Sequence, residues 1–67
     1  MKWISVKDKL PREPYSVMHR KTYLIYNDEG TNIATYIGYG GLWENLEGDR
    51  IYPFYWLDVE INLAEHH

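Results

Sequence analysis

Residues 21–39 carry the pattern that most limits the possible fold: two β-prone runs separated by a short turn signal. The runs are KTYLIY and TNIATYIGY, and both are rich in the β-branched and aromatic residues that are enriched in strands. Between them stands NDEG, in which Asn27 and Asp28 favour a turn. Gly30 can take the left-handed backbone that closes a short hairpin loop. The segment therefore predicts an antiparallel hairpin.

Further strand and turn signals surround this hairpin. WISV begins the chain with a short β-type stretch, GG at 40–41 and EGD at 47–49 indicate turns on either side of LWENL, and a last strand is predicted over 51–61. A helix over 57–65 is the alternative for LDVEINLAE, but alternation of apolar and polar residues fits more positions than helical spacing does. Ser5 followed by VKD predicts one helical turn near 6–9, which Pro11 prevents from continuing. We expect a mainly β fold, a small antiparallel meander or half-open barrel of four to five short strands, with at most that one helical turn.

The chain is short and lacks cysteine. Its 67 residues form one small domain, 1–67, and the absence of cysteine excludes disulfides and thiolate metal sites. A domain of this size has a small core, so its seven Tyr, three Trp and one Phe serve either a dense aromatic core or self-association. The closing EHH at 65–67 is equally typical of a native end and of the start of a purification tag, and no inference rests on it.

Charge is distributed unevenly along the chain. Residues 1–21 carry a formal charge of +4 and residues 22–67 a charge of −7, which indicates either two attracting halves or two distinct faces. No apolar run reaches the roughly 18 residues that cross a bilayer, and the start of the chain lacks the apolar stretch of a signal peptide. We therefore expect a cytoplasmic protein without membrane contact.

Several short motifs resemble a known family. WISVKDKLP at 3–11, YLIY, a glycine-flanked GLW and a closing aromatic segment with YW are together similar to the domain of unknown function 551, small proteins found mainly in bacteriophages, prophages and gut bacteria. Tyr55 stands where that family has a histidine, and LDVE replaces its proline-rich ending. The family has no established activity, so the resemblance implies a phage or mobile-element accessory protein, acting in the host cytoplasm if phage-encoded.

Candidate chemical groups are few. Ser16 and His19 are the one close pair of a nucleophile and a base, and they lie in a predicted loop of a domain too small for a deep pocket. The acids Glu44, Glu47 and Asp49 do not match the twelve-residue calcium loop, and a solvated turn explains them. We expect no enzymatic activity, no cofactor and no metal.

The segment IYPFYWLDVE points instead to binding. If Leu57 and Val59 face the interior, alternation leaves Tyr52, Phe54 and Trp56 on the opposite face, and aromatic residues dominate protein interfaces. The alternation depends on Pro53 preserving the strand register.

Two further aromatics, Tyr36 and Trp43, are predicted neighbours of this contact surface. The expected function is therefore a small protein-binding module whose partner is a host protein or a second copy in a homodimer. A single-stranded nucleic-acid platform is the alternative, although Asp58 and Glu60 on the aromatic strand disfavour it; a purely structural homo-oligomer is another. The predicted core comprises Trp3, Val6, Leu10, Leu24, Ile33, Ile37, Leu57 and Val59.

Overall fold

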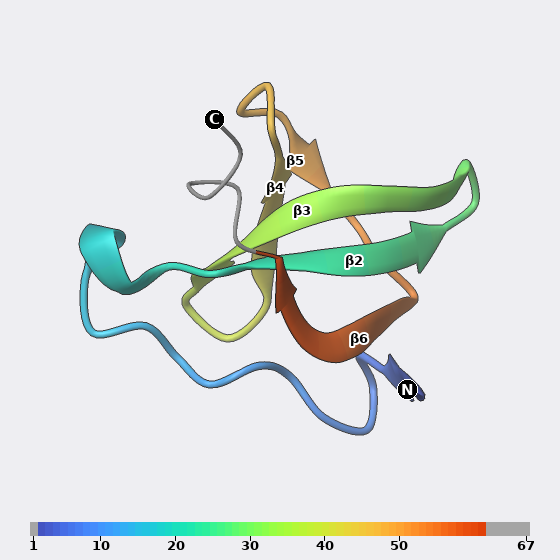
Figure 1. Ribbon diagram of the computed structural model, residues 1–67, viewed down its shortest axis with the longest axis horizontal. Helices are drawn as coiled ribbons and strands as arrows, with labels where there is room; N and C mark the ends of the chain where they lie inside the picture. The colour runs from blue at the N-terminus through green and yellow to red at the C-terminus, as the bar shows by residue number, and fades with distance from the viewer. Residues whose placement is uncertain (1, 62–67) are drawn as a thin grey trace.

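The computed structural model describes residues 2–61 and is mainly β, as predicted (Figure 1). Within these residues six strands form one antiparallel sheet, and a single 3-10 helix precedes the second strand. The elements are β1 (Trp3–Ser5), η1 (Val17–His19), β2 (Thr22–Asn27), β3 (Gly30–Gly38), β4 (Leu42–Asn45), β5 (Arg50–Ile51) and β6 (Tyr55–Ile61).

The strand order is β1-β6-β2-β3-β4-β5. Strands β2 to β5 follow one another as a meander, whereas β6 returns across the molecule to lie between β1 and β2. The sheet curls strongly, as the bent ribbon of β6 shows (Figure 1). Within residues 2–61 the edge strands β1 and β5 do not pair with each other, so the curled sheet stays half open.

The predicted hairpin is present. Strands β2 and β3 pair over their whole common length and end at the Asn27–Gly30 pair. The Asn27 side-chain oxygen accepts a hydrogen bond from the Glu29 backbone N–H at 3.0 Å, which is the local turn chemistry of asparagine. Gly30 has φ +102°, a conformation that costs other residues more than glycine.

The two later turns also form where the glycines predicted them. Tyr39, Gly40 and Gly41 all have positive φ in the β3–β4 connection. In the β4–β5 connection the Asn45 side-chain oxygen accepts hydrogen bonds from the backbone N–H groups of Glu47 and Asp49, both at 2.9 Å. Asn45 therefore organises the acidic turn.

The prediction of one continuous strand over 51–61 is wrong. Ile51 belongs to β5, where it pairs with Trp43, and β6 begins only at Tyr55. The buried Pro53 lies between them and has no N–H to donate to a sheet ladder. The strand count accordingly rises to six.

The turn near residues 6–9 is present, without becoming a helix. The backbone N–H groups of Asp8 and Lys9 donate to the Ser5 carbonyl at 3.0 and 3.1 Å. The Ser5 hydroxyl accepts a hydrogen bond from the Lys7 backbone N–H at 3.2 Å. The 3-10 helix at Val17–His19 was not predicted, because prolines 11 and 14 indicated only a loop.

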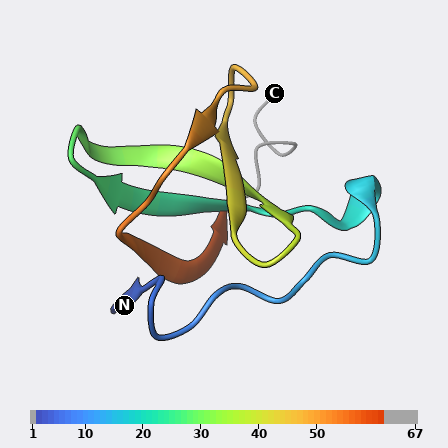
Figure 2. The same ribbon diagram turned by 180° about the vertical axis from the view of Figure 1, so that it is seen from behind.

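Residues 6–21, here called the strap, connect β1 to β2 along the open side of the curled sheet (Figure 2). Two buried aromatic side chains hold it in place. The Trp56 indole N–H donates to the Lys9 carbonyl at 2.9 Å, and the Tyr36 hydroxyl donates to the Glu13 carboxylate at 2.5 Å. The strap therefore covers the aromatic face of the sheet.

The core lies between the sheet and the strap. Its rings meet mostly edge to face, with centroids 4.9 Å apart for Tyr36 and Trp43 and 5.3 Å apart for Tyr23 and Trp56, an arrangement that aromatic pairs prefer. The buried apolar residues are Tyr23, Ile25, Ala34, Tyr36, Trp43 and Trp56, with Ile4, Val6, Leu10 and Ile51 packed against them.

Most of the predicted core therefore lies on the wrong side of the sheet. Alternation correctly grouped Leu24, Ile33 and Ile37, but the opposite alternation, containing Ile25 and Ala34, is the buried one. Leu57 is only half-buried, and Val59 and Trp3 are exposed. Of the eight residues predicted for the core, only Val6 and Leu10 pack against the observed one. Both faces of the strands are apolar, so the pattern identified which residues share a face without identifying the face that the strap covers.

Candidate functional site

Three of the five predicted contact residues are core residues. Trp56 and Tyr36 are 1% exposed and Trp43 is 2% exposed. They pack on one another and, for Trp56 and Tyr36, bond to the strap. The prediction that they form a contact surface is wrong, because all three rings are buried and the strap accepts the hydrogen bonds of Trp56 and Tyr36.

The other two predicted residues are exposed. Tyr52 is 73% exposed and lines a shallow hollow with Leu10 and Gly41. Phe54 is about half exposed, and its backbone joins β2 to the strap, donating to the Tyr26 carbonyl at 2.8 Å and accepting from the Val6 N–H at 3.0 Å. Both lie in or beside the β5–β6 connection rather than on a regular strand face.

The structure brings together a different set of exposed aromatics. Trp3 of β1, Tyr26 of β2 and Tyr55 of β6 are 40, 45 and 42% exposed. The Trp3 and Tyr26 rings meet edge to face with centroids 6.1 Å apart, and the Tyr26 and Tyr55 rings are 6.4 Å apart. These three residues, here called the outer cluster, line an apolar depression of about 290 Å³.

Strand pairing explains why the outer cluster forms. Tyr26 pairs with Tyr55, and Trp3 pairs with Leu57 on the other side of β6, so residues from three neighbouring strands share one face. The cluster was not predicted, because Trp3 was assigned to the core and the alternation from Leu57 also placed Tyr55 in the interior. Alternation places the neighbours Tyr55 and Trp56 on opposite faces of the strand. The cluster could have been predicted from it by assigning Trp56, instead of Tyr55, to the interior.

The apolar character continues beyond the outer cluster. Leu24 and Ile33 are paired across β2 and β3 and are only half-buried, as is Leu57, while Val59 is exposed. Antiparallel sheets commonly present a polar face to water. An apolar outer face of this extent is typical of a surface that contacts another molecule.

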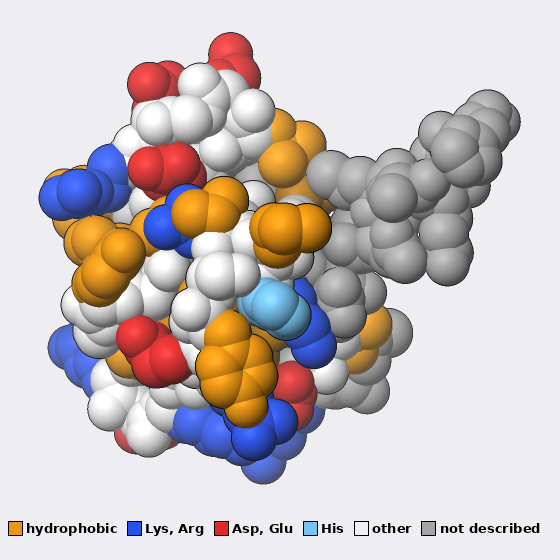
Figure 3. Space-filling view, turned by 90° about the vertical axis from the view of Figure 1, so that its left-hand side faces the viewer, with side chains coloured by type: hydrophobic (Ala, Val, Ile, Leu, Met, Phe, Trp, Pro, Cys, Tyr) orange, Lys and Arg blue, Asp and Glu red, His pale blue; other side chains and the backbone are white. Residues whose placement is uncertain are grey.

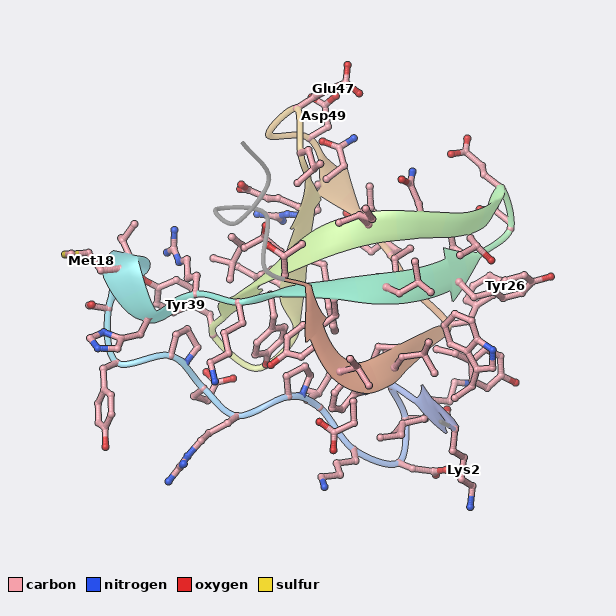
Figure 4. All side chains as sticks on the ribbon, in the orientation of Figure 1. Lys2, Met18, Tyr26, Tyr39, Glu47 and Asp49 are labelled. Carbon is pink, nitrogen blue, oxygen red and sulfur yellow. The ribbon has the colours of Figure 1, made fainter. Side chains whose placement is uncertain are left out.

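A second group of exposed apolar residues lies at the far end of the molecule. Met18 and Tyr39 lie at the opposite end from Tyr26 and Lys2 (Figure 4), and Tyr15 and Met18 are almost fully exposed. In the view of this end, hydrophobic side chains are scattered among charged ones (Figure 3). The hollow at this end is lined by Glu13 and Arg20 as well as by Tyr15 and Tyr39, so its lining is more polar than that of the outer cluster.

The strap also holds the pair of a hydroxyl and an imidazole that the sequence singled out. The Ser16 hydroxyl lies 2.9 Å from Nδ1 of His19, and both residues are exposed. The pair spans η1, with Ser16 immediately before it and His19 at its end. The Tyr15 ring packs edge to face on the imidazole at 5.6 Å. This is local turn chemistry of the kind that serine commonly makes.

Tyr36, whose pKa is strongly perturbed, belongs to the strap contact. Burial raises the pKa of Tyr36 well above its ordinary value of 10.0, and the hydrogen bond and negative charge of Glu13 raise the pKa further. The phenol is therefore held as a hydrogen-bond donor. This arrangement fastens the strap to β3.

Within residues 2–61 no group of three histidine, cysteine or acidic side chains is placed to hold a metal ion. None of the helices described is long and apolar enough to cross a membrane. Comparison of the chain with protein-family models, curated proteins and solved structures found no match.

Proposed function

We propose that this chain is a small non-enzymatic protein-binding module and that it binds through the outer cluster. The observation that carries this proposal is the set of three half-exposed aromatic side chains, Trp3, Tyr26 and Tyr55, around one apolar depression. Trp and Tyr are enriched among the residues that dominate binding energy at protein interfaces.

The rigidity of the cluster supports this role. Its three residues stand on paired strands, and their rings contact one another. Rings held in this way lose little conformational freedom when a partner covers them, and reduced ordering on binding increases affinity. The Tyr hydroxyls and the Trp indole N–H also provide polar tips that can bond to a partner's backbone.

The resemblance to the domain of unknown function 551 adds a biological context to this proposal. A phage or mobile-element accessory protein of this size would act on a host protein in the host cytoplasm, without cofactor. The departures at Tyr55 and at LDVE fall in β6, where Tyr55 belongs to the outer cluster. We therefore propose that the choice of partner is particular to this chain.

Single-stranded nucleic acid is the less favoured partner. Aromatic rings can stack on bases, but such platforms combine them with cations along the backbone path. The exposed acids Asp28 and Glu29 follow Tyr26 closely in the β2–β3 turn, and they would repel phosphates.

Affinity capture tests the proposed function. The immobilised chain is exposed to a lysate of the host cell, beside the variant Tyr26→Ser and the control Tyr15→Ser, which removes an exposed tyrosine from the strap. We expect a protein retained by the wild type and by Tyr15→Ser to be lost with Tyr26→Ser. Equal retention by all three forms would contradict the proposed surface.

A further inference from the structure

Charges of opposite sign stand at the two ends of the outer cluster. Lys2 precedes Trp3 on the edge strand β1, and the Asp28–Glu29 turn follows β2, the strand that carries Tyr26. All three charged residues are exposed. In Figure 4, Tyr26 lies between the β2–β3 turn on one side and Lys2 on the other.

This arrangement is complementary to itself. A two-fold axis through the outer cluster would place the aromatic rings of two copies against each other. The same rotation would bring Lys2 of each copy toward the Asp28–Glu29 turn of the other. Interfaces of this kind, in which one patch contacts its own symmetry copy, are the commonest in homo-oligomers.

We infer that the outer cluster binds a second copy of this chain as a two-fold dimer, with Lys2 of each copy facing Asp28 and Glu29 of the other. The inference rests on the proposed function and identifies the partner of that same surface. The apolar face supplies the affinity. The charges set the orientation, because exposed ion pairs contribute little energy but disfavour mismatched arrangements.

The expected affinity is modest. The cluster has three main side chains, and small interfaces of this type are weak and transient. We therefore expect reversible dimerisation with a dissociation constant in the micromolar range. Dimerisation should also weaken as salt is added, because salt screens exposed charges.

Charge exchange between two variants tests the inference. Lys2→Glu makes the surface acidic at both ends, and the double variant Asp28→Lys, Glu29→Lys makes it basic at both ends. Each variant alone would place like charges together at both contacts of the dimer. In a mixed dimer, however, both contacts again join opposite charges.

Sedimentation equilibrium measures the dissociation constant of the dimer for the wild type, for each charge variant alone and for an equimolar mixture of the two charge variants. We expect roughly tenfold weaker self-association for each variant, from the sum of two exposed pairs reversed in sign, and recovery of wild-type association in the mixture. Tyr26→Ser should abolish dimerisation, whereas Tyr15→Ser should leave it unchanged. Circular dichroism and the urea midpoint establish that each variant is folded.

Several results would overturn the inference. A wild type that stays monomeric at several hundred micromolar rules out the dimer, and a dimer unaffected by Tyr26→Ser lies elsewhere. A mixture no tighter than the separate variants contradicts the two-fold arrangement. The two proposals can fail separately. If the chain is monomeric but its capture of a lysate protein still depends on Tyr26, the protein-binding role stands and only the second copy is excluded as partner.

Discussion

At the scale of single residues, the polar tips of buried aromatics decide where the core lies. Burying an indole N–H or a phenol without a hydrogen bond costs free energy. Trp56 and Tyr36 avoid this cost because the strap presents the Lys9 carbonyl and the Glu13 carboxylate to them. Tyr26 and Tyr55 instead remain partly in solvent. The same residue types thus serve as core or as surface according to what faces their polar ends.

Tyr36→Phe tests the contact between Tyr36 and the strap. At neutral pH we expect a loss of about 1–2 kcal/mol in the free energy of unfolding, because a charge-assisted hydrogen bond disappears while the exposed Glu13 regains water. Urea denaturation measures it. The control is Tyr39→Phe, which alters an exposed tyrosine and should change stability by less than about 0.5 kcal/mol. Equal effects would contradict the contact.

The raised pKa of Tyr36 predicts that the stability effect of Tyr36→Phe depends on pH. The folded-state pKa of Tyr36 is raised above its ordinary value of 10.0, so the neutral phenol is favoured by folding. Its contribution to stability is complete below about pH 10 and declines as pH rises further, because the unfolded chain loses this proton first. The stability gap between wild type and Tyr36→Phe should therefore stay constant up to about pH 9 and narrow as pH rises above about 10. A gap that widens over this interval would disprove the assignment.

At the scale of elements, the strap is the least regular segment and yet closes the core. It has one short helix and two prolines in its middle, and it bonds to the buried side chains of Trp56 and Tyr36 and to the backbones of Phe54 and Tyr36. Gly38, the last residue of β3, shows how closely it packs: an added Cβ would lie 3.2 Å from both a Glu13 oxygen and a Pro14 ring carbon.

Gly38→Ala and Gly40→Ala form a matched pair that measures this packing. Both glycines have positive φ, but a Cβ at Gly40 would meet nothing within 4 Å. Gly40→Ala should cost about 1–2 kcal/mol from backbone strain alone, and Gly38→Ala about 1 kcal/mol more from overpacking against the strap. Urea denaturation measures both. Equal losses would indicate that the strap moves away from β3 at no cost.

At the scale of the whole molecule, one curled sheet has two apolar faces and only one of them is covered within residues 2–61. The strap and the curl enclose the inner face, with Ile25 at 0% exposure. The outer face keeps Ile33 half-buried and leaves the outer cluster accessible. A covered inner face provides stability, and an uncovered outer face provides a surface for binding.

Ile25→Val and Ile33→Val compare the two faces with the same chemical change. Removing one methylene group should cost about 1 kcal/mol at Ile25, where the core cannot relax fully. At Ile33 the loss should be below about 0.5 kcal/mol, since water already reaches the side chain. Thermal unfolding at low protein concentration checks this, because dilution removes any contribution from association. A larger loss at Ile33 would mean that the outer face is the true interior.

The amino-acid sequence by itself determined the class of fold and the positions of the three turns that follow β2, β3 and β4. The hairpin at Asn27–Gly30, the glycine turns after β3 and β4 and the β character of the chain all arise from local chemistry. Within β2 and β3 alternation also determined which side chains share a face, whereas over 51–61 the break at Pro53 separates the exposed Tyr52 and Phe54 from the buried Trp56. Leu24, Ile33 and Ile37 were correctly grouped by this alternation.

Tertiary structure alone decided which face became the core. When both faces of a strand are apolar, the two-residue alternation does not distinguish the buried face from the exposed one. Which face is buried then depends on contacts between residues distant in the chain. Trp56 lies 47 residues from the Lys9 carbonyl that accepts its N–H, and Tyr36 lies 23 residues from Glu13. These long-range hydrogen bonds place the strap over one face and leave Trp3, Tyr26 and Tyr55 exposed on the other.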